Sequence, residues 1–204
     1  MSTQAVHQIA SADFPTRWGK FRIHGFRGEF GSDGNRRVEE AVALVMGDIH
    51  SSAPLVRIHS QCLTGDVFHS LRCDCGQQLE MALSMIAEEG AGILLYEQQE
   101  GRGIGLMAKL QAYELQDTGL DTVEANERLG FKADYREFTL PAEMLKTLGA
   151  TRVRLLSNNP EKVEALERAG VKVVERVPCE VEPSAHAKEY LKTKKEKLGH
   201  LFTS

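Results

Sequence analysis

The chain has 204 residues, 42% of them hydrophobic, and a formal net charge of −4 at neutral pH. This apolar content is enough for one buried core, so we expect a flexible tail at residues 1–12 and a single folded domain at 13–204. The acidic balance argues against a nucleic-acid partner, and the lack of a long apolar stretch or a signal-like N-terminus argues against a membrane and indicates the cytoplasm.

The first half of the chain predicts several strands and then a helix. In order, these are strands at 18–27, 40–49 and 54–60, with a turn at 31–34. Residues 77–89 are rich in helix formers and precede Gly90, a residue type that often ends helices. A cysteine-rich segment therefore lies where a strand meets a helix.

The second half predicts strands that alternate with helices. In order, these are a strand at 92–96, a glycine loop at 101–105, a helix at 106–117, a strand at 152–156, a helix at 160–169, a strand at 171–177 and a lysine-rich C-terminal helix at 188–197. Pro160 suits the first helical position, where no N–H is needed. This alternation favours an α/β fold, with a mixed β-sheet flanked by helices and an antiparallel N-terminal part.

Three of the four cysteines lie close together in the sequence, at Cys62, Cys73 and Cys75. Zinc takes three protein ligands in catalytic sites and four in closed structural sites. The cluster therefore predicts a metal site that is either open or closed by His59 or His69. The alternative is that these thiols are small buried side chains of a reduced protein. Cys179 lies far along the chain and is expected to be a bystander.

Three further motifs could bind an anionic ligand, and each also has a purely structural explanation. The 101–105 loop could let the backbone approach a ligand or could only form a tight turn, and its Arg102 is suited to phosphate. The segment 157–162 could be an anion site at a helix N-terminus or an ordinary cap. Asp134 and Arg136 could face one cavity or form a surface ion pair.

Taken together, these residues resemble the GTP cyclohydrolase II family of riboflavin biosynthesis. The matching segments are 57–66, 71–76, 99–102, 115–117, 121–126, 129–131, 134–138 and 157–160. The likeness runs in order from about residue 15 to residue 201, which makes it far more specific than any one motif.

The resemblance implies that GTP is hydrolysed at two places, releasing formate from C8 of guanine and pyrophosphate from the triphosphate. The product would be 2,5-diamino-6-(5-phospho-D-ribosylamino)pyrimidin-4(3H)-one. The resemblance further implies one Zn2+ on Cys62, Cys73 and Cys75, Mg2+ with the triphosphate, and a homodimer. The implied GTP-binding residues are Arg57, Ile58, His59, Ser60, Gln61, Gln78, Glu100, Gly101, Arg102, Thr122, Ser157 and Lys162.

Three catalytic roles are implied in the same way. Asp134 would be the general base or proton acceptor, Tyr113 would position the attacking water, and Arg136 would attack the α-phosphate. Because a guanidinium stays protonated, the alternative is that Arg136 stabilises phosphate charge while water attacks. Three thiolates leave a zinc centre at net −1, so it acidifies water less than neutral ligands do, and a separate base is useful.

Two residues depart from the usual family pattern. Gln61 stands where Glu is usual, and Gly103 stands where Asn is usual. These departures leave open a paralogue that stops at a formamidopyrimidine, since Gln61 removes a carboxylate beside the metal. A separate alternative is a non-catalytic zinc module that binds nucleotide or a partner protein. A zinc nucleobase deaminase is excluded, because segments 59–61 and 73–75 lack its His-x-Glu and Cys-x-x-Cys motifs.

Overall fold

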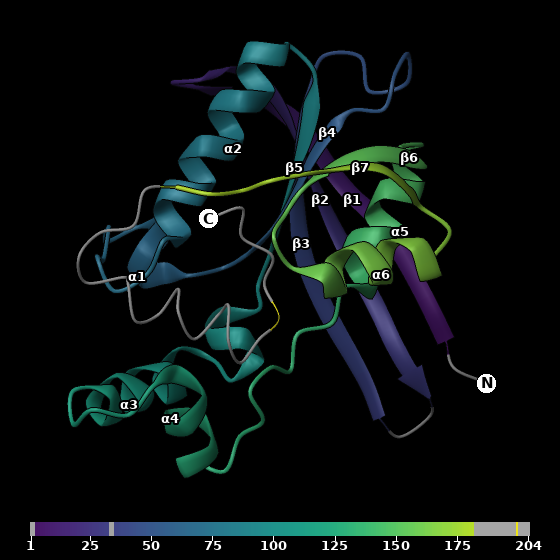
Figure 1. Cartoon of the computed structure of the whole chain (residues 1–204). Helices are drawn as coiled ribbons and strands as arrows, with labels where there is room; N and C mark the ends of the chain where they lie inside the picture. The colour runs from purple at the N-terminus through teal and green to yellow at the C-terminus, as the bar shows by residue number, and fades with distance from the viewer. Residues whose placement is uncertain (1–2, 33–34, 182–198, 200–204) are drawn as a thin grey trace.

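Seven strands form one mixed sheet in the order β1-β2-β3-β5-β4-β6-β7 (Figure 1). The computed structural model describes residues 3–32, 35–181 and 199. The strands are β1 Thr3–Thr16, β2 Gly19–Ser32, β3 Asn35–Met46, β4 Leu55–Ser60, β5 Gly92–Glu97, β6 Arg152–Leu156 and β7 Lys172–Val177. Strands β1, β2, β3 and β5 pair antiparallel, whereas β5, β4, β6 and β7 pair parallel. The predicted fold class is therefore confirmed.

The expected tail at residues 1–12 is wrong for the described part of the chain, because β1 begins at Thr3. This strand pairs with β2 from Thr3↔Gly31 to Thr16↔Gly19, with an irregularity between Gln8 and Ala10. Its side chains are mostly exposed. Backbone hydrogen bonds to a neighbouring strand order the segment, and burial contributes little, so its own apolar pattern does not reveal it.

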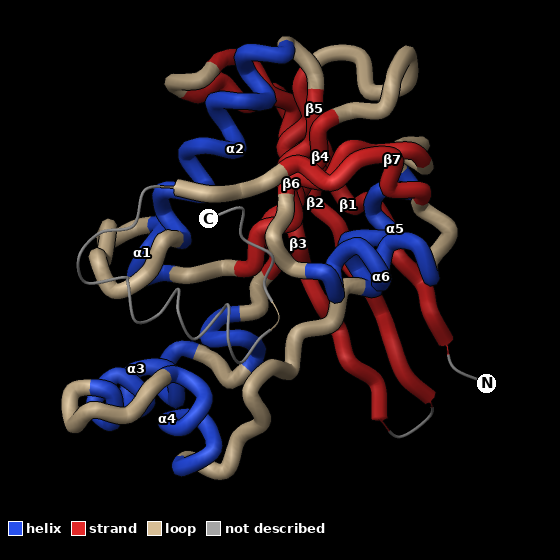
Figure 2. Tube along the Cα trace, viewed as in Figure 1, coloured by secondary structure: helices blue, strands red, loops and turns tan. Residues whose placement is uncertain are grey.

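Helices cover both faces of the parallel half of the sheet (Figure 2). Helix α2, Cys75–Glu89, packs on one face, and α5, Thr139–Thr147, and α6, Pro160–Arg168, lie on the other. Alternate residues of β5 project to opposite faces, so Leu94 joins the core under α2 while Ile93 and Leu95 join the core under α5 and α6. The sheet thus separates two hydrophobic layers.

The remaining helices gather near the carboxyl ends of the parallel strands. They are α1 Leu63–Asp66, the 3-10 turn η1 Glu100–Gly103, α3 Leu106–Gln116 and α4 Thr122–Arg128. Helices α3 and α4 pack against each other as an arm at the lower left of Figure 1. None of the helices in the described ranges is both long and apolar enough to cross a bilayer.

Most of the predicted strands and helices are present in the structure, although some of their ends differ by a few residues. Helix α2 ends at Gly90 in the left-handed conformation, as expected. Besides β1, four elements were not predicted, namely α1, η1, α4 and α5. Helix α5 carries Pro141 in its first turn, where proline is tolerated although it reads as a helix breaker in the sequence. The predicted helix at 188–197 and residues 33–34 of the predicted turn lie outside the described residues.

Candidate active site

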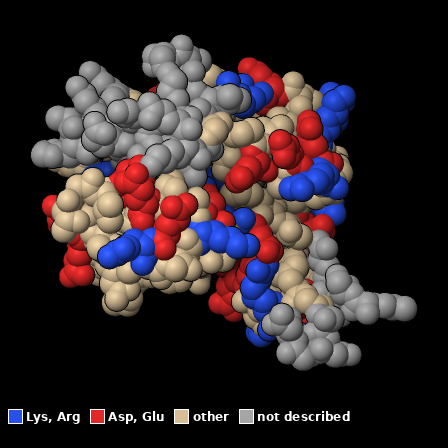
Figure 3. Space-filling view, turned by 60° about the horizontal axis from the view of Figure 1, so that its bottom comes forward, with Lys and Arg blue, Asp and Glu red and all other residues tan. Residues whose placement is uncertain are grey.

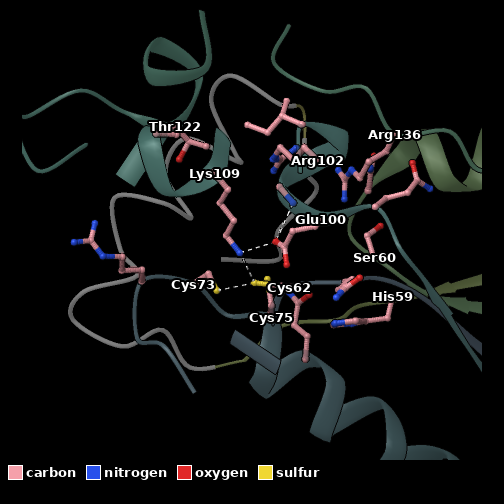
Figure 4. Close-up of a pocket in the computed structure, with 18 of the residues that line it drawn as sticks. His59, Ser60, Cys62, Cys73, Cys75, Glu100, Arg102, Lys109, Thr122 and Arg136 are labelled. Carbon is pink, nitrogen blue, oxygen red and sulfur yellow. Dashed lines mark hydrogen bonds and ion pairs between the residues drawn. The ribbon is translucent and has the colours of Figure 1, made fainter. Parts of the chain in front are cut away.

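A pocket lies beyond the carboxyl ends of β4, β5 and β6, which meet at one edge of the sheet. Ligands of open α/β sheets bind at this edge, because the loops that leave parallel strands converge there. Each strand contributes residues from its end or from the loop that follows it, and the arm formed by α3 and α4 closes the opposite side. Figure 4 shows the side chains that point into this space.

Most of the predicted site residues line this one pocket. They are Arg57, His59, Ser60, Gln61, Cys62, Cys73, Cys75, Gln78, Glu100, Gly101, Arg102, Tyr113, Thr122, Arg136, Ser157 and Lys162. Two predicted residues are not in its lining. The Ile58 side chain is fully buried in the core, and only its carbonyl points toward the site, accepting a hydrogen bond of 2.8 Å from Lys162 Nζ. Asp134 lies behind the lining, between two arginines.

The three clustered cysteines bring their sulfur atoms within 4.8 Å of one another. Cys62 immediately precedes α1 and Cys75 begins α2, so the starts of these two helices hold the thiols close together. Gly65 faces them, and a Cβ added there would lie 3.0 Å from Cys73 Sγ and 3.1 Å from Cys62 Sγ. A side chain at position 65 would crowd the sulfur atoms, so the glycine preserves room for a metal ion. The donor set and this space both fit a thiophilic cation such as zinc.

The thiols share negative charge even without a cation. Hydrogen bonds from the Cys73 and Cys75 thiols, with the nearby Lys109 ammonium, hold the pKa of Cys62 far below its usual range. The same interaction with Cys62 raises the pKa of Cys73 to about 11. One thiolate is therefore stabilised by two thiols. Since metal ligands must be deprotonated, occupation of the site by a cation would release the remaining protons.

The Asp66 carboxylate organises the loop that carries Cys62. It accepts hydrogen bonds from His59 Nε2 at 3.0 and 3.1 Å, from the Cys62 backbone N–H at 3.0 Å and from the Tyr96 hydroxyl at 2.9 Å. Burial lowers the pKa of His59 despite the nearby carboxylate. The imidazole is therefore neutral, with its proton on Nε2 toward Asp66. Because Asp66 occupies His59 Nε2, that nitrogen is not free to close the cysteine site.

We expect Asp66→Asn to destabilise the fold by about 2 kcal/mol, because an amide has one acceptor oxygen for three buried donors. Chemical denaturation measures the free energy of unfolding. Asp117→Asn is the matched control, since Asp117 pairs with Arg72 on the surface and its side chain is 62% exposed. Equal stability of the two variants would contradict the role of Asp66.

A second cluster joins η1 to the segment before α5. Arg102 Nη1 donates to Asp134 Oδ2 at 2.7 Å, and Arg136 donates to the same carboxylate through Nε at 2.9 and 3.1 Å and through Nη2 at 2.6 Å. Burial alone would raise the pKa of Asp134, but the hydrogen bonds and charges of the two arginines outweigh it and lower that pKa. Asp134 therefore holds two guanidinium groups in place, and Arg136 faces the pocket.

The backbone of η1 is left-handed at three successive residues. Gly101 and Arg102 both have φ of 60°, and Gly103 has φ of 88°. This conformation is uncommon for arginine and indicates a backbone held by its surroundings. A Cβ at Gly103 would lie 3.0 Å from Cβ of Tyr135, so the backbone conformation and the available space both favour glycine at this position.

The segment before α6 is a helix cap, as the structural explanation of this motif predicted. The Asn159 side chain accepts from the Glu161 backbone N–H at 3.0 Å, and the Ser157 hydroxyl accepts from the Asn159 N–H at 3.1 Å. Lys162 is nevertheless buried beside the pocket, and desolvation, with the charges of Arg57 and Arg136, lowers its pKa. The cap therefore serves the fold and also brings a buried amine to the site.

Several lining residues were missed, chiefly Arg72, Lys109 and Gln116. Lys109, Tyr113 and Gln116 are spaced i, i+4 and i+7 on α3, so helical periodicity starting from Tyr113 could have identified them. The Arg72 guanidinium lies 5.0 Å from the centre of the Tyr113 ring. Arg72 directly precedes Cys73 in the sequence, and this position could have identified it as a lining residue.

Comparisons with known proteins show the family of this chain. The family model for GTP cyclohydrolase II matches residues 7–178. GTP cyclohydrolase-2 of Escherichia coli O9:H4 (strain HS) is 57% identical over 198 residues, covering 97% of this chain and 98% of that protein.

The riboflavin biosynthesis protein RibBA of Aquifex aeolicus (strain VF5) is 53% identical over 199 residues, and the match spans 97% of this chain but only 48% of RibBA. The crystal structure of RibBX, a two-domain 3,4-dihydroxy-2-butanone 4-phosphate synthase from A. baumannii, aligns with a TM-score of 0.47 at 21% identity, over 86% of this chain and 40% of that one, too weakly to support a functional comparison. On the strength of the family match and the near-complete alignment with GTP cyclohydrolase-2, the chain belongs to the GTP cyclohydrolase II family of hydrolytic enzymes.

Proposed function

We propose that this chain catalyses the first step of riboflavin biosynthesis, converting GTP to 2,5-diamino-6-(5-phospho-D-ribosylamino)pyrimidin-4(3H)-one with release of formate and pyrophosphate. One observation carries the proposal: three thiols that fit a metal and two arginines that fit phosphates line the same pocket. In Figure 4 Cys62 and Arg136 lie on different sides of that space, with Glu100 between them. This separation suits a nucleotide that reacts at both its base and its triphosphate.

The metal in this proposal is Zn2+, held by Cys62, Cys73 and Cys75. When bound, it supplies Lewis acidity for the hydrolytic opening of the guanine ring at C8. Tyr113 lies beside the thiols, with its hydroxyl 3.2 Å from Thr64 Oγ1. Burial is the largest cause of its raised pKa, so the phenol keeps its proton. We therefore assign Tyr113 to orienting water or the base as a hydrogen-bond partner.

Arg102 and Arg136 would bind the phosphates, together with the Mg2+ that accompanies a nucleoside triphosphate. Planar guanidinium groups match phosphate oxygens, and both are already oriented by Asp134. We favour charge stabilisation by Arg136 over nucleophilic attack, because its Nε and Nη2 both donate to a carboxylate and have no free lone pair. Asp134 would then position Arg136. Its lowered pKa makes it a weak proton acceptor at neutral pH.

The guanosine part would bind between β4, η1 and α4. The side chains of Arg57 and Gln78 are already oriented by hydrogen bonds. Arg57 Nη1 donates to the Leu156 carbonyl at 3.0 Å, and Arg57 Nη2 donates to Gln78 Oε1 at 2.7 Å. Other proposed contacts are the backbone of Ile58, with His59, Ser60, Gln61, Glu100, Gly101, Thr122, Ser157 and Lys162. Substrate groups would meet an arrangement already fixed, which reduces the cost of ordering side chains on binding.

Incubation of the zinc-loaded protein with GTP and Mg2+ tests the proposal. We expect formate, pyrophosphate and the diaminopyrimidine in equal amounts, measured together by chromatography and an enzymatic formate assay. Pyrophosphate without formate would instead support the paralogue that stops at a formamidopyrimidine, and Gln61 would be the first suspect because it lines the pocket next to Cys62. No turnover despite bound zinc would support a nucleotide-binding module.

We also propose a homodimer in the cytoplasm, with no nucleic-acid or membrane partner. Among the residues that the structure describes, basic and acidic side chains are interspersed over the face shown in Figure 3 and do not form one continuous basic patch of the kind that favours nucleic acid. Light scattering after size-exclusion chromatography measures the oligomeric state directly.

A further inference from the structure

Lys109 reaches from α3 to the cysteine cluster, where it contacts three acceptors. Its Nζ lies 2.8 Å from Glu100 Oε1 and 3.2 Å from Cys62 Sγ, as the dashed lines in Figure 4 mark. It also lies 2.9 Å from Thr64 Oγ1. The side chain is only 12% exposed. An ammonium group has three protons to donate, so these three contacts use its full capacity and fix its position.

The simplest explanation is an ordinary ion pair between Lys109 and Glu100. That explanation is incomplete, because the Glu100 carboxylate also accepts from two backbone N–H groups, those of Leu63 at 2.7 Å and Gly101 at 3.0 Å. The Glu100 carboxylate therefore fixes the position of the Lys109 amine. The contact with Cys62 Sγ brings the positive charge of this amine to the thiol cluster. Thr64, two residues after Cys62, ties the amine to the same loop.

The net charge expected for a metal-bound cluster explains why a nearby cation would stabilise it. Three thiolates with one divalent cation sum to −1, in a pocket partly shielded from water. Hydrogen bonds to a coordinated sulfur withdraw electron density from it, and such partners fix the orientation of the ligand as well. A cation 3.2 Å from Cys62 Sγ offsets part of this excess negative charge at one of the three ligand atoms.

We propose that Lys109 is a positioning residue for the metal ligand Cys62, holding the sulfur through an N–H···S hydrogen bond and offsetting the negative charge of the three-thiolate centre. The inference rests on the metal site of the proposed function. It assigns a role to a residue that the sequence motifs did not single out, and it requires no contact between Lys109 and the nucleotide.

Metal binding by the GTP-free full chain tests this role. We expect Lys109→Leu to bind Zn2+ about 10–100-fold more weakly in competition with a chromophoric chelator, the usual effect of removing a group that orients a metal ligand. With Co2+ in place of Zn2+, the thiolate-to-metal charge-transfer band should move to lower energy, because the sulfur regains electron density. Lys109→Arg keeps the charge and N–H donors, so it should restore most of the affinity and the band position.

Lys146→Met is the matched control, since Lys146 lies on α5 and pairs with Glu143 on the surface. It should bind both metals like the original chain. If Lys109→Leu fails to fold by circular dichroism, Lys109→Gln takes its place, with the same band shift expected. Unchanged affinity and an unchanged band in a folded Leu or Gln variant would overturn the inference. Absence of metal binding by the original chain would instead overturn the metal site of the proposed function.

Discussion

Replacing Cys62, Cys73 or Cys75 by alanine is expected to remove stoichiometric zinc and to slow formate release from GTP on the order of 10³-fold. The magnitude follows because Lewis-acid stabilisation is worth several kcal/mol and each 1.4 kcal/mol is about tenfold in rate. Two remaining thiols cannot hold zinc in an open three-ligand site. Elemental analysis of the purified protein, together with a coupled formate assay, measures both effects.

Cys179→Ala is the control for this experiment. Cys179 is fully buried in the core under α2, and its hydrogen bonds to Asn158 and Gln78 use backbone atoms. The variant should keep its zinc and its formate release, with only a modest loss of stability. Full zinc content and normal turnover in the Cys73→Ala variant would refute the proposed metal site.

Asp134→Asn is expected to slow pyrophosphate release about 10²-fold, because a neutral amide no longer holds Arg102 and Arg136 in the orientation that meets the phosphates. The pH profile separates this positioning role from that of a general base. Since the pKa of Asp134 is lowered from an already acidic value, its own titration lies well below neutral pH. We therefore expect Asp134→Asn to slow pyrophosphate release, while any change of this rate near neutral pH occurs at the same pH as in the original chain.

Glu137→Gln provides the comparison for Asp134. Glu137 is a nearby carboxylate that pairs with Arg37 at 2.6 Å, and its side chain is 54% exposed. This variant should retain the pyrophosphate rate, and Asp134→Glu should recover part of it by restoring a charge for the arginines. Disappearance of a limb near neutral pH in Asp134→Asn alone would favour the general base over the positioning role.

Some elements were predictable because their signals lie within the segment itself. The helix at 77–89 combines helix formers with a terminal glycine. The strand at 152–156 is a short segment with three branched apolar residues, followed by a capping segment. Both elements are present. Strand β1 was not predictable, since its order comes from pairing with β2 while its own side chains remain largely exposed. Short helices such as α4 depend on a capping box and give too few residues for periodicity.

The sequence by itself determined the family to which this chain belongs. The three clustered thiols, the glycine loop with Arg102 and the Asp134–Arg136 pair identify the family, because residue type and spacing along the chain carry that information. Only the tertiary structure decided how these groups act together. It placed Asp134 behind two arginines, Ile58 in the core and Lys109 against Cys62. The physical reason is that hydrogen bonding, burial and electrostatic coupling depend on distances between residues remote in sequence, which are set when the parallel strands bring their carboxyl ends to one edge of the sheet.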